Sequence, residues 1–409
     1  MTLRLRAATA SLPVRNTGLG SIVHKSRPFS KVDPRFEVNA VVLERVAIVS
    51  LDAFFIGERL RNETRDAFPE LESLLLVASH THYAPNLDPE LPNLAPFDEE
   101  NFQLAKQAIA ETIRKALTVE ARATIGYAQH ADDGEGVNRR SRRLTFLSRP
   151  PFLRYGMTMN PEPRAPRDRL IRVVALGDGP SAIVWNYGVH PTSFPDDTMA
   201  HPEYAVVVRE ALRRRFGSNV AVLFLPGFMG DVRPSVWDSQ WTLGTLARGR
   251  LHGPVFRRSF PSMDVWEAWA SRIAEHVVEV AEATRPEPLE TLKSAEASRT
   301  ATDLLAEGDV ARPFRVTALR LGHGPVIVAV SSEVVSDYAR LAQSLDSAPV
   351  IPVGYEGGAV GYLPTRQMIP EGGYEVDWFA KGFSFAGRWS PRAEERFVAL
   401  MKQAIDATC

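Results

Sequence analysis

The chain has 409 residues, of which 44% are hydrophobic and 24% charged, and its formal net charge is −1. This composition is typical of a globular protein with a large core and excludes a disordered chain. The near-zero charge argues against a nucleic-acid partner or an anionic membrane, because both require a positive excess. The one cysteine, Cys409, excludes an intrachain disulfide and a cysteine-ligated metal.

No apolar run approaches the length of a membrane span, and the first apolar run is too short for a secretory signal. We therefore expect a cytoplasmic protein that acts on a small molecule and has no stable membrane association. A homo-oligomer is compatible with the sequence.

The first part of the chain alternates predicted strands and helices. A glycine-rich loop at 17–21 lacks the spacing of a phosphate-binding fingerprint and is interpreted as a turn. Asp52 follows two predicted strands and is interpreted as a cap for the next segment or as a carboxylate behind a site. The further predictions are strands at 38–44, 45–51, 74–79 and 123–128, and helices at 56–68 and 98–117.

Residues 132–169 are rich in Arg, Pro and Gly with weak periodicity, which predicts a long functional or disordered loop. Gly177-Asp178-Gly179-Pro180 joins two predicted strands at 170–176 and 182–187 and indicates a hairpin. The remaining predictions are helices at 203–216, 265–284, 334–345 and 391–407, strands at 220–225, 312–320 and 325–330, and an insertion at 237–260. We find no internal repeat, so the fold predicted is a single α/β domain over 1–409. Its core is a layered mixed β-sheet flanked by helices, with the active site at the strand ends.

Polar side chains follow several of the predicted buried strands. In α/β sheets the ligand crevice lies at the carboxyl ends of the strands, so this repeated placement favours one shared site. Two histidines and a glutamate are a common catalytic zinc set. On a strand His80 and His82 would point to one side, so both could bind one metal, or one could bind the metal and the other the substrate. The residues at these positions are His80, His82, His190, Asp231, Arg233 and Glu333.

In their order and in their residues, these segments resemble the catalytic domain of the neutral ceramidases, which are zinc amidases that cleave ceramide. The similarity extends from about residue 8 to about residue 380 and leaves no room for that family's C-terminal immunoglobulin-like domain. It rests on Ala78-Ser79-His80-Thr81-His82, Asn138-Arg139, Val189-His190-Pro191-Thr192-Ser193, Gly230-Asp231-Val232-Arg233-Pro234, Glu333, the tyrosine segment Val353 to Thr365, and Tyr374.

The resemblance implies a Zn²⁺ ion held by His80, His190, Glu333 and Tyr362, with Tyr355 as the alternative to Tyr362. It also implies that three further residues face the scissile amide, namely His82, Arg139 and Tyr374. Asn138 is interpreted as a substrate-binding residue or, alternatively, as a residue that tethers the long loop. His201 is near the His190 loop in the sequence and is interpreted as lining the pocket. Asp231 is interpreted as a supporting or capping residue, and His130, His252, His276 and His323 as ordinary histidines.

Arg233 stands where the family has its active-site serine. An arginine cannot act as an acyl nucleophile, whereas its planar fork of donors suits a carboxylate or phosphate. We therefore expect a zinc-dependent amidohydrolase that uses a metal-activated water on a soluble, polar or anionic N-acyl substrate. The alternatives are an esterase, a sugar N-deacetylase, or a non-catalytic member of the family that binds a ligand.

Overall fold

A computed structural model describes residues 3–16, 28–146, 153–236 and 261–409. Two predicted features lie outside these residues. They are the glycine-rich turn at 17–21 and the insertion at 237–260, which contains His252. Among the described helices, none combines the length and the apolar character that a membrane crossing requires.

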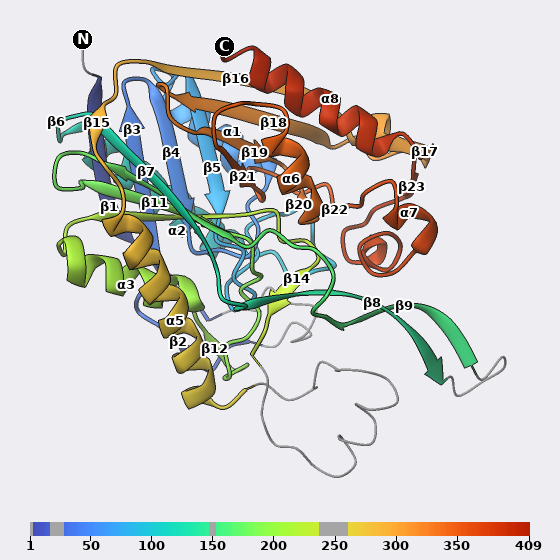
Figure 1. The fold of residues 1–409 in the computed structure, drawn as a ribbon. Helices are drawn as coiled ribbons and strands as arrows, with labels where there is room; N and C mark the ends of the chain where they lie inside the picture. The colour runs from blue at the N-terminus through green and yellow to red at the C-terminus, as the bar shows by residue number, and fades with distance from the viewer. Residues whose placement is uncertain (1–2, 17–27, 147–152, 237–260) are drawn as a thin grey trace.

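Three of the described sheets form the body of the molecule (Figure 1). The first has the order β5-β4-β3-β1-β6, with the strands β1 Arg4–Ser11, β3 Glu37–Leu43, β4 Val46–Leu51, β5 Ser73–Ala78 and β6 Ala121–Arg122. The second has the order β13-β11-β10-β7-β15, with β7 Thr124–Ala131, β10 Leu170–Leu176, β11 Ala182–Tyr187, β13 Ala221–Pro226 and β15 Glu287–Pro288. The third has the order β16-β18-β19-β21, with β16 Leu292–Thr300, β18 Pro313–Leu321, β19 Val326–Val330 and β21 Val350–Val353.

Each of these sheets contains the same succession of elements. An antiparallel pair is followed by a helix and then by a strand that lies parallel to the second strand of the pair. The successions are β3-β4-α1-β5, β10-β11-α3-β13 and β18-β19-α6-β21, with the helices α1 Glu58–Ala67, α3 Tyr204–Phe216 and α6 Asp337–Gln343. The mixed α/β fold is therefore the predicted one, but it contains three related units that the sequence did not show.

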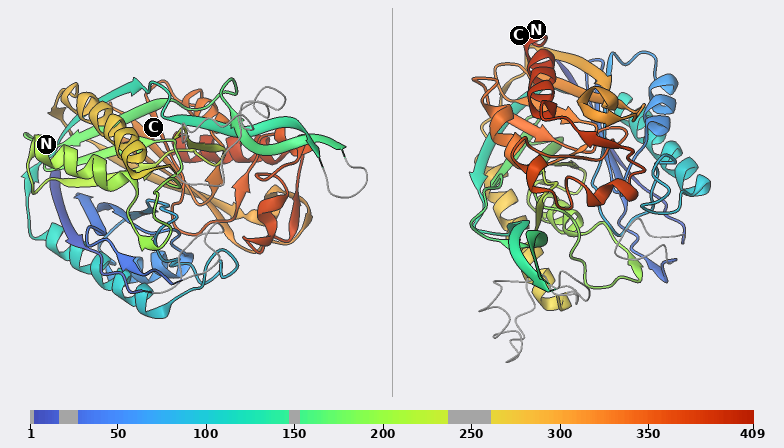
Figure 2. Two further views of the ribbon diagram at one scale, coloured as in Figure 1. Left: turned by 90° about the horizontal axis from the view of Figure 1, so that it is seen from below. Right: turned by 90° about the vertical axis from the view of Figure 1, so that its right-hand side faces the viewer.

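The three sheets share one apolar core. Buried side chains from each sheet pack together, among them Val41, Ile48, Val174, Leu223, Ile327 and Ile351. Because side chains alternate along a strand, the opposite face of each sheet is also apolar, and helices cover it. Helix α2 (Glu99–Leu117) packs on the first sheet, α3 and α5 (Met263–Glu282) on the second, and α6 and α8 (Ala393–Asp406) on the third (Figures 1 and 2).

Helix α2 shows how local sequence sets these elements. Its N-terminus is capped by Asp98, whose carboxylate accepts the backbone N–H of Asn101 at 2.7 Å. Acidic residues fill the first turn and basic residues the last, which complements the helix dipole. The helix begins one residue after the predicted position and ends at the predicted one.

The stretch predicted as an irregular loop at 132–169 is instead a long hairpin. Its strands are β8 (Gly136–Phe146) and β9 (Leu153–Glu162), and their outer ends project from the body (Figures 1 and 2). A short strand, β14 (Val232–Pro234), pairs with the base of β8. The loop prediction was wrong because Arg139, Arg140, Arg142 and Arg143 leave β8 without the alternation of a half-buried strand. The alternation of Leu153, Tyr155 and Met157 in β9 was the signal available in the sequence.

The capping role predicted for Asp52 is also wrong. The residue before helix α1 is Gly57. The buried Asp52 carboxylate instead accepts the backbone N–H of Glu37 and pairs with Arg209, 3.0 Å away. It therefore ties the first sheet to helix α3.

The remaining described elements are short. They are β2 Lys31–Val32, β12 Met199–Ala200, β17 Leu305–Gly308, β20 Glu333–Val334, β22 Tyr362–Leu363 and β23 Gly387–Trp389, with the helices η1 Ala301–Leu304, α7 Met368–Glu371 and η2 Trp378–Lys381.

Candidate metal-binding site

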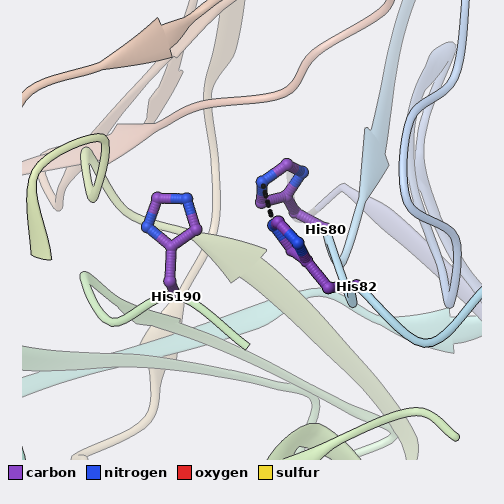
Figure 3. A group of neighbouring side chains, drawn as sticks. All are labelled: His80, His82 and His190. Atoms are coloured by element: carbon purple, nitrogen blue, oxygen red, sulfur yellow. Dashed lines mark hydrogen bonds between the residues drawn. The ribbon is translucent and has the colours of Figure 1, made fainter. Parts of the chain in front are cut away.

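The predicted histidines and glutamate meet at the carboxyl ends of strands from all three units. His80 follows β5, His190 follows β11, and Glu333 lies in β20, directly after β19. Figure 3 shows the imidazoles of His80, His82 and His190 facing one another from two separate segments. One ring nitrogen of each lies within 4.8 Å of the others, which is close enough for all three to contact one metal ion.

The path of the chain at His80 differs from the prediction. Strand β5 ends at Ala78, and His80 has a φ angle of 59°, which is rare for a residue with a side chain. The two histidines therefore do not share a side through strand alternation. The turn nevertheless brings them together, with the Nε2 atoms of His80 and His82 3.3 Å apart (Figure 3).

The surroundings of His80 and His190 fix which nitrogen each presents. His80 Nδ1 lies 3.1 Å from the Phe54 carbonyl oxygen, and His190 Nδ1 lies 2.6 Å from that of Met229. A carbonyl oxygen only accepts hydrogen bonds, so we assign the ring proton to Nδ1 in both residues. Their Nε2 atoms then present lone pairs toward the centre of the site.

The Glu333 carboxylate lies at the same point. Its Oε2 is 3.3 Å from His190 Nε2 and 3.7 Å from His80 Nε2. Burial lowers the pKa of both His80 and His190 to about 3, so both rings are neutral at pH 7. Burial also raises the pKa of Glu333. Protons on Glu333 and on His82 Nε2 could satisfy the two nitrogens one at a time, whereas a single cation can bind the lone pairs of both nitrogens and of the carboxylate together. The donor set therefore fits a metal ion.

Two tyrosines flank this carboxylate. Tyr362 of β22 lies opposite Glu333 in the parallel pairing of β20 with β22. The Tyr355 hydroxyl lies 3.3 Å from Glu333 Oε2. Hydrogen bonds from both hydroxyls oppose the effect of burial on the pKa of Glu333. The Tyr355 ring also stacks on His80 with 4.0 Å between the centroids. Both tyrosines considered as the fourth ligand are therefore beside the site, and both alternatives stay open.

The hairpin base brings Arg139 to the same place. The Arg139 Cζ atom lies 5.4 Å from the centre of the Tyr362 ring and 5.1 Å from that of Tyr374. Its Nε donates to Glu375 Oε1 at 2.7 Å. Sequence reasoning did not single out Glu375, because an acidic residue in a segment with little regular structure carries no signal of burial. Its position after Tyr374 was the only available hint.

Asn138 and Asp231 connect the hairpin to the third unit. The Asn138 side chain donates to Asp231 Oδ2 at 2.7 Å and to the Pro166 carbonyl oxygen at 3.1 Å. The other Asp231 oxygen accepts the backbone N–H of Ser336 at 2.7 Å. Through these contacts Asp231 connects β8 to the segment before α6.

Arg233 lies close to Arg139. It is in β14, opposite Val137 of β8. Burial lowers the pKa of Arg233 to about 10, and the charge of Arg139 contributes to this shift. Both guanidinium groups are charged at pH 7, so the site contains two cationic side chains beside the histidines.

His201 contributes its backbone to the site. Its carbonyl oxygen accepts the Thr81 hydroxyl at 2.8 Å, which supports the segment between the two site histidines. Its ring stacks on Phe194, with 3.7 Å between the centroids, and lies 3.4 Å from an Asp33 carboxylate oxygen.

The sequence matches no protein-family model and no curated protein. Two solved structures are similar in fold. Neutral ceramidase from Pseudomonas aeruginosa is 14% identical with a TM-score of 0.73, over 99% of this chain and 74% of that one. A ceramidase complexed with C2 is also 14% identical, with a TM-score of 0.71 over 99% of this chain and 75% of that one. At this level of identity the likeness concerns the fold, and this chain has the α/β fold of neutral ceramidase.

Proposed function

We propose that the protein is a zinc-dependent hydrolase that cleaves the amide bond of a polar or anionic N-acyl substrate with a metal-activated water. The observation that carries this proposal is the buried convergence of His80, His190 and Glu333, whose lone pairs one cation would bind together. The fold shared with neutral ceramidase and the motifs that resemble that zinc amidase family support the choice of reaction.

The residues suited to hold the ion are His80, His190, Glu333 and Tyr362, with Tyr355 as the alternative to Tyr362. Two imidazoles and a carboxylate, completed by a further oxygen, suit zinc. A bound zinc ion lowers the pKa of a coordinated water and polarises a carbonyl group. The carbonyl oxygens at Nδ1 of both histidines fix the ring orientations, as supporting groups do in metal sites.

Three residues are proposed to act on the substrate. His82 Nε2, 3.3 Å from His80 Nε2, is placed to carry a proton between the water and the leaving amine. The Arg139 guanidinium stabilises the developing oxyanion, and the Tyr374 hydroxyl beside it donates to the same region.

Arg233 is proposed to determine the substrate class. Two guanidinium groups at one site repel each other, and an anionic substrate group relieves that repulsion. We therefore propose a carboxylate or phosphate on the substrate, bound by Arg233, while Asn138 keeps the hairpin base in place. We also retain the sequence-based expectation that the protein is cytoplasmic.

The test combines metal analysis with a panel of defined substrates. N-acetyl-4-nitroaniline is neutral and N-succinyl-4-nitroaniline is anionic, and 4-nitrophenyl acetate and N-acetylglucosamine test the ester and sugar alternatives. We expect one zinc per chain, loss of turnover on chelation with recovery on adding zinc, and faster turnover of the succinyl compound. Stoichiometric metal without turnover of any compound would instead support a ligand-binding protein.

A further inference from the structure

Glu375 is a buried carboxylate for which neither the sequence motifs nor the proposed reaction provides a role. Its side chain is 2% exposed, and it follows Tyr374 in the segment between α7 and η2. One oxygen accepts from Arg139 Nε at 2.7 Å and the other from Arg140 Nη1 at 2.7 Å. Such a pair of short, charge-assisted hydrogen bonds fixes both guanidinium groups.

The shape of β8 makes this contact possible. Successive side chains of a regular strand point to opposite faces, so Arg139 and Arg140 would normally diverge. The register of β8 with β9 shifts between Asn138 and Arg140, and this irregularity falls at Arg139. Both arginines can therefore reach the single carboxylate of Glu375.

Arg140 and Arg139 differ in the contacts that they make besides the one to Glu375. Arg140 is also held by Glu371, 3.2 Å away, and by the Gly372 carbonyl oxygen, 3.0 Å away. The buried Arg139 Nη2 makes no hydrogen bond among the described residues. With Nε bonded to Glu375 and the Tyr362 and Tyr374 rings both adjacent to the guanidinium, the Nη2 group of Arg139 remains for another acceptor.

We propose that Glu375 is a positioning residue that holds the Arg139 guanidinium with Nη2 directed at the oxygen of the reacting carbonyl. This inference rests on the proposed hydrolase function. Glu375 does not contact the substrate and acts only through Arg139. It also compensates the charge of a buried guanidinium.

A double-mutant cycle on zinc-loaded protein with N-succinyl-4-nitroaniline tests the coupling. We expect Arg139→Ala to lower kcat by about 100- to 1000-fold. Glu375→Gln should lower kcat by about 10- to 100-fold with a smaller change in KM. The double variant should be no slower than Arg139→Ala, because Glu375 acts through that residue alone. Multiplicative losses in the double variant would overturn the inference.

The matched control is Glu371→Gln. Glu371 is the last residue of α7, four positions before Glu375, and it binds Arg140 and Arg142, whereas Arg139 Nε donates to Glu375. Its replacement should leave kcat and zinc content unchanged. A loss equal to that of Glu375→Gln would show that disruption of the segment, rather than of Arg139, causes the defect.

A second measurement does not depend on turnover. In protein labelled with ¹⁵N-arginine, the Nε–H signal of Arg139 is assigned by its absence in Arg139→Lys. We expect slow exchange with solvent in the wild type and fast exchange in Glu375→Gln, with no change in Glu371→Gln. An Arg139 signal that does not respond to Glu375→Gln overturns the inference. Failure of the wild type to hydrolyse the panel overturns only the proposed function.

Discussion

Two buried glutamates, Glu356 and Glu333, differ in the side chains that contact their carboxylates. The Glu356 carboxylate is fully buried and paired with two arginines, Arg61 at 3.0 Å and Arg315 at 3.5 Å. Glu333 is as deeply buried, but the charged or polar atoms that approach it at similar distances are those of neutral imidazoles and tyrosines.

The difference separates a structural cluster from a functional one. Two guanidinium groups pair with Glu356, so its charge is compensated by side chains of the protein itself. The cluster at Glu333 has no arginine bonded to its carboxylate among the described residues, and it gathers nitrogen and oxygen lone pairs that one cation could bind together. The comparison therefore predicts that mutations at the two clusters affect different properties.

The largest expected effect is at the Glu333 cluster itself. His80→Ala and Glu333→Gln each remove one of the proposed ligands, so we expect zinc to be lost and turnover to fall to background. The overall fold should persist, because the units remain packed through their apolar core. Zinc analysis and circular dichroism measure these outcomes. Undiminished zinc in both variants would contradict the metal assignment.

His82→Ala distinguishes the neighbouring histidine from a ligand. We expect zinc content to remain and kcat to fall by about 100- to 10,000-fold, since a proton-transfer group contributes this much. Metal analysis and steady-state kinetics on the same preparation provide the comparison. Loss of zinc would instead make His82 a ligand, as the geometry of the three histidines also permits.

Arg315→Met tests the Glu356 cluster. Removing one partner leaves a buried charge incompletely neutralised, so we expect a loss of about 3–5 kcal/mol in the free energy of unfolding. Zinc affinity should be unchanged in the folded protein. Arg299→Met, on an exposed position of β16, is the control and should unfold like the wild type in urea. Equal stability of both variants would show that the Glu356 cluster is not structural.

The smallest expected effect concerns substrate choice. Arg233→Ser removes a charged hydrogen-bond donor, so KM for N-succinyl-4-nitroaniline should rise by about 10- to 100-fold. Turnover of the neutral N-acetyl compound should change little. An equal effect on both substrates would contradict a role for Arg233 in binding an anion.

The sequence predicted the parts of the site that depend on buried strands. His80, His190 and Glu333 each follow a continuous apolar run, and strand ends in such folds meet at one edge. It could not predict the left-handed turn at His80, because a positive φ is uncommon at any residue other than glycine, even at histidine, where it is enriched. Glu375 was missed because its partners are more than 200 residues away, and only tertiary packing brings them together.

The repeated succession of elements was missed for a different reason. Helix α2, the β8–β9 hairpin and helix α5 are inserted between the units, so no fixed period remains in the sequence. What the three units share is the order of antiparallel pair, helix and parallel strand. Apolar side chains of many kinds can fill such an arrangement.

The three-unit architecture has a consequence for folding. The proposed ligands His190 and Glu333 are separated by 143 residues, and each unit contributes at least one ligand. A bound ion would act as a cross-link between three distant chain segments, and cross-links that close long loops restrict the unfolded chain most. The site can form only after all three units have docked. Metal uptake would therefore report the completion of folding, and metal-free protein should be more readily cut by proteases in the segments between the units.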